Sequence, residues 1–197
     1  GSQNENEGSS ALIRLQSSGH NRGLVGFDES AIEAYIGQSQ NYTAKLQFTI
    51  IDNGNNWGND GRTIDVHRVL NSWVEGNGFI VGNSPSDRGT GSGVTWNCSV
   101  DAETSNQNDD CSGTTAWDMT NSSNWPFIST PTATTTITSN QTGVVEFDVT
   151  SDVASFVAGT NQNYGWVIKK TNEGQNGRIE FGTKESSYTP RLIITLD

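Results

Sequence analysis

The 197-residue sequence has few cysteines, few basic residues and no long apolar run. Two cysteines exclude a scaffold held by several disulfides, and no CxxC pair is present to form a zinc site. Its 11 Lys and Arg residues stand against 22 Asp and Glu residues, and this net charge of −11 argues against nucleic acid and anionic membranes as partners. No apolar run approaches the roughly 18–20 residues of a membrane span, so we expect no membrane insertion.

Catalytic signatures are also missing. The sequence contains no P-loop, no GxSxG elbow, no HExxH and no GxGxxG. The neighbouring carboxylates of Asp28-Glu29 and Asp109-Asp110 point apart on an extended chain and make poor acid–base pairs. His67 lies in a strand-like run, where a structural hydrogen-bonding role is expected. We therefore predict that the protein is not an enzyme and requires no cofactor.

Alternation of apolar and polar residues is the clearest positive signal, above all from Gly143 to Asp197. Short segments there place their apolar residues on one face: Val145, Phe147 and Val149; Ile179 and Phe181; Leu192, Ile194 and Leu196. The apolar content is only 31%, and abundant Gly, Asn, Ser and Thr are typical of strands joined by polar loops. The sequence predicts an all-β, jelly-roll-like β-sandwich.

Further strands are expected at 11–16, 22–28, 43–52, 63–70 and 131–139. Two short helical turns interrupt them. Ser30 to Glu33 form a capping-box pattern that opens the first turn, which runs through Ile36. The second has Thr150, Ser151 and Asp152 as possible caps, a stripe of Val153, Phe156 and Val157, and Gly159 at its end. We expect a polar N-terminal lead at 1–10 and a single domain at 11–197, with a long irregular insertion at about 76–132.

Cys98 and Cys111 flank a polar loop that cannot order itself. We predict a disulfide between them, which would contribute roughly 3 kcal/mol by restricting the unfolded chain. Free thiols and half of a metal site are the alternatives, although His20 and His67 are isolated in the sequence. A disulfide would place the protein in an oxidising setting, extracellular or at the cell surface.

Calcium is the one ion that the sequence suggests. The Gly-rich segment 52–61 offers hard oxygen ligands from Asp52, Asn53, Asn55, Asn59 and Asp60. Their spacing does not match the EF-hand loop. Asn, Asp and Gly are also ordinary turn formers, so a calcium loop and a plain turn both remain open.

Six tryptophans raise the possibility of sugar stacking, because an aromatic ring with a polar edge suits a pyranose face. Trp57, Trp117 and Trp125 lie in polar loops and are the candidates; the alternative is that they cover the end of the sandwich. Trp73, Trp96 and Trp166 are expected to be buried. If the protein is a secreted glycoprotein, its N-glycosylation sites would be the four sequons, at Asn41, Asn97, Asn121 and Asn140.

The predicted strands and turns, in their order along the chain, resemble DNRLRE-type β-sandwich modules. This group overlaps a carbohydrate-binding module family linked to alginate-type polysaccharides. The resemblance rests on RGLVGFDESAI (22–32), TAKLQFTI (43–50), DVHRVLNSWVEGNG (65–78), GVTWN (93–97), VEFDVTSDVASFVAG (145–159), NYGWVIK (163–169), GRIEFGTKE (177–185) and PRLIITL (190–196). It implies a jelly-roll-like sandwich of the kind found on secreted proteins.

One departure from the family pattern shapes the functional hypothesis. Modules of this family usually begin with a strand that precedes a segment like NENEGSS (4–10). That strand is absent here, which would leave a sheet edge unpaired. The leading hypothesis is a non-catalytic extracellular structural protein, a surface or matrix filament subunit that assembles with copies of itself by strand exchange or edge pairing. The alternative is a carbohydrate-binding module for a polysaccharide.

Overall fold

The computed structural model describes residues 3–16, 20–79, 85–112 and 116–197, and the chain falls into two compact units. The sandwich unit comprises 12–68 and 130–197, and the loop unit comprises 1–11 and 69–129. Within the described residues, no helix combines the length and apolar character that crossing a bilayer would require.

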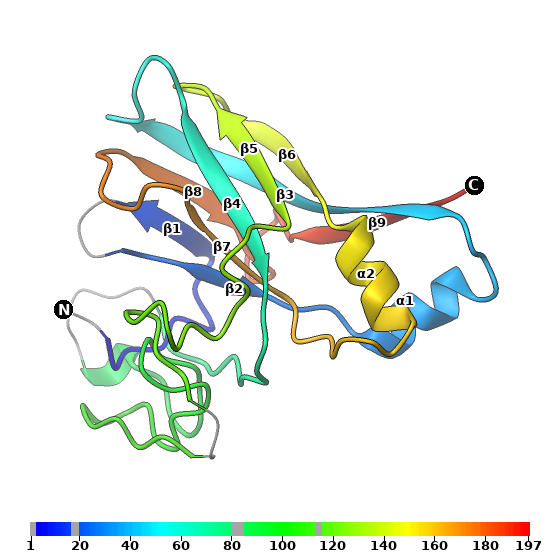
Figure 1. Cartoon of the computed structure of the whole chain (residues 1–197). Helices are drawn as coiled ribbons and strands as arrows, with labels where there is room; N and C mark the ends of the chain where they lie inside the picture. The colour runs from blue at the N-terminus through cyan, green and yellow to red at the C-terminus, as the bar shows by residue number, and fades with distance from the viewer. Residues whose placement is uncertain (1–2, 17–19, 80–84, 113–115) are drawn as a thin grey trace. The chain divides into compact units, whose positions relative to one another are not determined.

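The sandwich unit consists of two antiparallel sheets that face each other (Figure 1). One sheet has the order β1-β8-β3-β6, with β9 also paired to β3, and the other has the order β2-β7-β4-β5. The strands are β1 Leu12–Gln16, β2 Gly23–Val25, β3 Tyr42–Asn55, β4 Arg62–Arg68, β5 Ala133–Ile137, β6 Gly143–Asp148, β7 Trp166–Lys170, β8 Arg178–Gly182 and β9 Arg191–Leu196. The prediction of an all-β sandwich is confirmed.

Period-two alternation explains the core of this unit. Phe48 on β3 is fully buried, and its ring contacts Phe147 of β6 at 6.2 Å and Phe181 of β8 at 5.6 Å between centroids. Burial of such rings is the main stabilising term in a sandwich of this kind. Leu196 departs from the pattern and is 40% exposed, because it pairs with Tyr42 at the end of the β3–β9 ladder.

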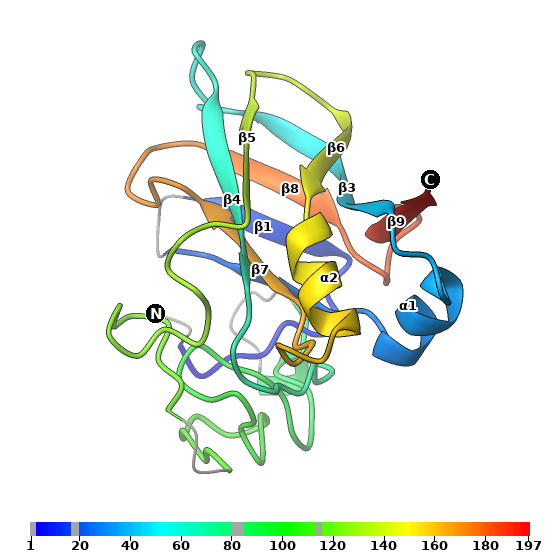
Figure 2. The ribbon, with the colours of Figure 1, turned by 45° about the vertical axis from the view of Figure 1, so that its right-hand side comes forward.

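Two helices of eight residues, α1 Glu29–Ile36 and α2 Thr150–Val157, lie together at one end of the sandwich unit (Figure 2). The predicted caps are wrong in both. Asp28 rather than Ser30 caps α1, accepting the backbone N–H of Ala31 at 2.8 Å. Val149 occupies the N-cap of α2.

The side chains expected to cap α2 make other bonds. The Thr150 hydroxyl accepts the backbone N–H of Ala44 at 2.9 Å, which ties α2 to β3. The Asp152 carboxylate accepts the indole N–H of Trp166 at 2.8 Å and the hydroxyl of Thr132 at 2.6 Å. Thr150 and Asp152 therefore fasten α2 to neighbouring segments of the sandwich unit. They do not cap the N-terminus of the helix, as the sequence pattern predicted.

Candidate functional site

The loop unit has little regular structure, and the side chain of Asn6 organises it. Asn6 is 1% exposed, and its Nδ2 donates to the carbonyl oxygens of Glu75 at 2.6 Å and Val94 at 2.8 Å. Its Oδ1 accepts the backbone N–H groups of Gly8 and Gly78, each at 3.0 Å. One amide thus joins the N-terminal segment to two distant loops. Apart from the short 3₁₀ helix η1 Pro85–Asp87, the described part of this unit contains no helix or extended strand.

Glycines make room for Asn6. Gly76 has a φ of +78°, and a Cβ there would lie 2.4 Å from the Asn6 carboxamide oxygen. Both the positive φ and the close approach require glycine at this position. The polar composition of 4–10 does not indicate this packing, so the sequence analysis missed Asn6.

The disulfide between Cys98 and Cys111 is present, as predicted, with the two Cα atoms 5.1 Å apart. A short ladder runs beside it. Gly93 and Asp101 exchange backbone hydrogen bonds at 3.0 and 2.8 Å, and Asp101 also forms a β-bridge with Cys111. The covalent bond and the ladder together order the loop from 93 to 111.

A polar hollow of about 180 Å³ opens beside this loop and is lined by Gln3, Asn4, Asn97 and Asp109. The Asn97 amide donates to Asp109 Oδ2 at 2.9 Å, which fixes both side chains. Asn4 donates its Nδ2 to the carbonyl oxygen of Gln107. Three amides and one carboxylate offer donors and acceptors of the kind that bind hydroxyl groups.

The three tryptophans that the sequence offers as candidate stacking platforms have different environments. Trp57, in the sandwich unit, is fully buried and donates its indole N–H to the carbonyl oxygen of Ile137 at 2.8 Å. It offers no ring face to a ligand, so the stacking hypothesis is wrong for Trp57 and the covering alternative fits better. Trp117 is only 7% exposed and donates to the carbonyl oxygen of Thr95 at 3.2 Å.

Trp125 and Trp96 retain partial exposure in the loop unit. The Trp125 ring stacks on Phe127, with centroids 4.9 Å apart and planes 18° from parallel. Trp96 was expected to be buried, yet its indole N–H donates to the exposed Thr120 hydroxyl at 2.7 Å. The backbone N–H of Trp96 also donates to the carbonyl oxygen of Gln3 at 3.0 Å, which places this tryptophan next to a residue of the hollow.

A family model, carbohydrate-binding module family 96, matches residues 93–196, more than half of the chain. The chain belongs to carbohydrate-binding module family 96. A comparison with curated proteins finds no match. Family membership supports the carbohydrate-binding alternative better than the filament hypothesis, which stays a prediction.

In this family 96 module, the predicted calcium segment begins with a carboxylate that is already paired. Asp52 Oδ2 lies 3.1 Å from Arg178 Nη2, and Asp52 Oδ1 accepts the backbone N–H of Gly54 at 3.3 Å. The Gly54 hydrogen bond and then Arg178 hold the pKa of Asp52 below its ordinary value. The charge that a calcium ion would neutralise is therefore balanced within the sandwich unit.

The other predicted ligands of that segment have separate environments. Asn53 is 1% exposed and donates its Nδ2 to the carbonyl oxygen of Thr138 at 2.9 Å. Asn59 and Asp60 are exposed, and the side chain of Asn55 lies outside the described residues. Calcium at 52–61 stays a prediction.

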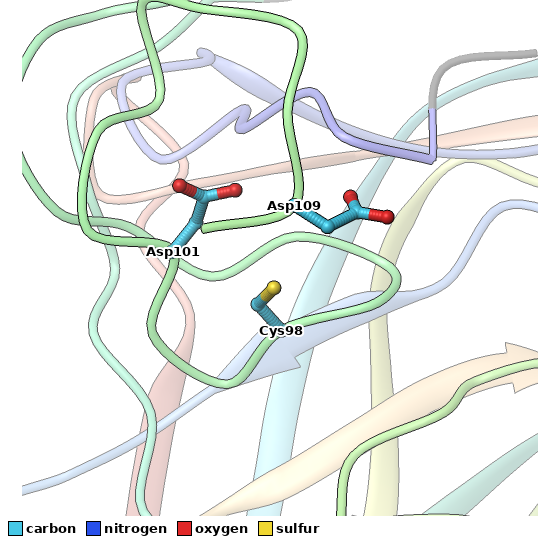
Figure 3. A group of neighbouring side chains, drawn as sticks. All are labelled: Cys98, Asp101 and Asp109. Atoms are coloured by element: carbon cyan, nitrogen blue, oxygen red, sulfur yellow. The ribbon is translucent and has the colours of Figure 1, made fainter. Parts of the chain in front are cut away.

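One group of three potential metal ligands occurs among the described residues, in the loop unit (Figure 3). It comprises Cys98, Asp101 and Asp109, whose ligand atoms lie within 4.8 Å of one another. The Cys98 sulfur is bonded to Cys111, so the group offers two carboxylates and no thiolate. Nothing in the sequence indicates that Asp101 is buried, so these three residues could not be grouped from the sequence.

The sandwich unit contains a second polar cluster, and its charges are paired. Arg22 forms a two-pronged ion pair with Glu173, with N–O distances of 2.7 and 2.8 Å, and Lys169 Nζ lies 3.9 Å from Glu173. Burial lowers the pKa of Lys169. His67, expected to be structural, is 3% exposed with its Nε2 3.8 Å from Asp65 Oδ2. We infer that this cluster stabilises the fold of the sandwich unit.

The Arg22–Glu173 pair predicts acid sensitivity. Burial alone would raise the pKa of Glu173, but the hydrogen bonds and charge of Arg22, helped by Lys169, outweigh it and lower the pKa below the usual 4.5. A lowered folded-state pKa adds stability above about pH 4.5, and this contribution is lost as the pH falls through the folded-state value. We expect Glu173→Gln to cost about 1–2 kcal/mol at pH 7 and progressively less below pH 4.5.

Urea unfolding between pH 3 and pH 7 measures this effect. The exposed Glu185 provides the matched control, and Glu185→Gln should change the free energy of unfolding by less than about 0.5 kcal/mol throughout. A Glu173→Gln deficit that does not shrink in acid would contradict the role of the ion pair.

The four sequons also have different environments. Asn41, Asn121 and Asn140 are exposed. Asn97 is partly exposed, and its Nδ2, the atom to which an N-glycan attaches, is the donor to Asp109 in the hollow. A glycan on Asn97 would therefore occupy the hollow, whereas one on any of the other three would not use a lining residue.

Proposed function

We propose that this chain is a non-catalytic, extracellular carbohydrate-binding module that holds a polysaccharide in the polar hollow of its loop unit. The observation that carries the proposal is the hollow, in a chain whose family binds carbohydrate. The disulfide supports an oxidising compartment outside the cell.

The lining residues supply a complementary set of hydrogen-bonding groups. Asp109 accepts one bond from Asn97, which leaves acceptor capacity on its carboxylate for sugar hydroxyls. Gln3 and Asn4 each bring an amide that can both donate and accept. Because Asn97 and Asp109 already hold each other, their geometry costs little further ordering on binding.

Aromatic contacts would complement these hydrogen bonds. Trp96 adjoins Asn97 in the chain, and its backbone is bonded to Gln3. Its partly exposed ring can cover the apolar face of a sugar while the hollow binds the hydroxyls. The net charge of −11 favours a neutral polysaccharide over a polyanion.

Mutagenesis of the hollow tests the proposal. Asn97→Ala removes a lining amide and releases Asp109, so binding to a panel of soluble neutral polysaccharides should weaken at least about tenfold, which corresponds to roughly 1.4 kcal/mol. Isothermal titration calorimetry and affinity electrophoresis provide the measurement. The exposed Asn124 gives a matched control, and Asn124→Ala should bind like the wild type.

A second variant, Gln3→Ala, changes the hollow from the N-terminal segment and should weaken binding as well. Each variant is first checked for folding by its near-ultraviolet circular dichroism. Wild-type binding that persists undiminished in folded Asn97→Ala and Gln3→Ala proteins would place the sugar elsewhere.

A further inference from the structure

Asp101 is a buried carboxylate that is only partly satisfied. Its side chain is 0% exposed, and Oδ1 accepts the backbone N–H of Glu103 at 3.1 Å. Oδ2 is buried and has no hydrogen-bond partner within the described residues. No Lys, Arg or His in that part of the chain forms an ion pair with it.

Leaving a carboxylate oxygen buried and unpaired is costly, so a native structure that keeps one calls for a partner. Among the residues that the structure describes, no protein group supplies it. Asp109 lies nearby and adds a second negative charge, which makes the need for a cation greater.

The distance between the two side chains allows one cation to be held by both carboxylates. Oxygens of Asp101 and Asp109 lie within 4.8 Å of each other, and Figure 3 shows the two residues as neighbours in the loop unit. Calcium–oxygen bonds of about 2.3–2.6 Å allow one ion to bridge oxygens separated by up to about 5 Å. We propose that Asp101 and Asp109 bind a calcium ion.

The ligand chemistry favours calcium over other divalent metals. The neighbouring sulfur belongs to a disulfide and is not a thiolate, and the group contains no His, so zinc lacks its preferred ligands. Calcium accepts six to eight oxygens in flexible geometry and can complete its shell with water. Magnesium demands a near-ideal octahedron, which two irregular loop carboxylates do not impose.

Such an ion would fasten the loop unit. Asp101 belongs to the ladder that joins Gly93 to Cys111, and Asp109 lies on the far limb of the disulfide loop. A calcium ion would link these limbs a second time, beside the covalent bond. This role goes beyond carbohydrate binding and requires no sugar, although Asp109 also lines the hollow.

Thermal unfolding and calorimetric titration of the whole chain, without any sugar, test the proposal. After EDTA treatment and dialysis, calcium chloride should raise the Tm by on the order of 5 °C at saturation, because an ion bound only by the folded state stabilises it. Asp101→Asn should abolish the shift, and Asp109→Asn should weaken calcium binding about tenfold or more. Asp110→Asn is the matched control, because Asp110 is exposed and bonds to Asn106 instead, so it should keep the shift.

Three outcomes would overturn the proposal. The wild-type chain could bind no calcium at millimolar concentration in the titration, which needs no variant to fold. The shift could survive in Asp101→Asn and Asp109→Asn alike. Finally, it could disappear in Asp60→Asn while surviving in Asp101→Asn, which would assign the ion to 52–61.

Discussion

Replacing Asn6 by Ala is expected to lower the free energy of unfolding of the loop unit by about 3 kcal/mol. The substitution removes four hydrogen bonds at once, two to the carbonyl oxygens of Glu75 and Val94 and two from the N–H groups of Gly8 and Gly78. Each buried group left unsatisfied costs about 1–3 kcal/mol, and partial access of water reduces the sum.

Hydrogen exchange followed by mass spectrometry is the measurement for Asn6→Ala. Protection should fall across 3–11, 74–79 and 85–95, while the strands of the sandwich unit keep theirs if the units open separately. Asn124→Ala, an exposed change of the same type, should alter protection little. Unchanged protection in Asn6→Ala would show that the glycine-rich loops hold their positions without this amide.

Removing the disulfide should have an effect of similar size. Cys98 and Cys111 are separated by 13 positions, and closing a loop of this length stabilises the folded state by roughly 3 kcal/mol in the chain-entropy model. The Cys98→Ala, Cys111→Ala double variant should therefore unfold at lower urea concentration. Limited proteolysis should cut it first between 98 and 111.

Sugar binding should weaken in the same double variant, since Asn97 and Asp109 lie on opposite limbs of this loop. A reducing agent provides the control: it should destabilise the wild type and leave the double variant unchanged. If reduction changes neither stability nor proteolysis of the wild type, the 93–101 ladder suffices to order the loop.

The sandwich could be predicted because its signal is local. Alternation with period two places Phe48, Phe147 and Phe181 on inner faces whatever the order of the strands. The cysteine pair was predictable for a similar reason, since a polar loop between the only two cysteines has one covalent means of closure.

The loop unit could not be predicted, because its order depends on contacts between distant segments. Nothing near Asn6 in the sequence indicates that its amide lies between 75–78 and 94. The burial of Trp57 could not be predicted either. Its neighbours in the sequence are polar, yet its indole N–H donates to the carbonyl oxygen of Ile137, 80 positions away.

Chemical-shift mapping of the ¹⁵N-labelled chain during titration with a neutral polysaccharide that it binds locates the sugar site. The largest shifts are expected for the backbone and side-chain amides of Gln3, Asn4 and Asn97, with the indole N–H of Trp96 moving alongside them. Shifts confined to the sandwich unit, with the loop unit unperturbed, would rule out the hollow as the binding site.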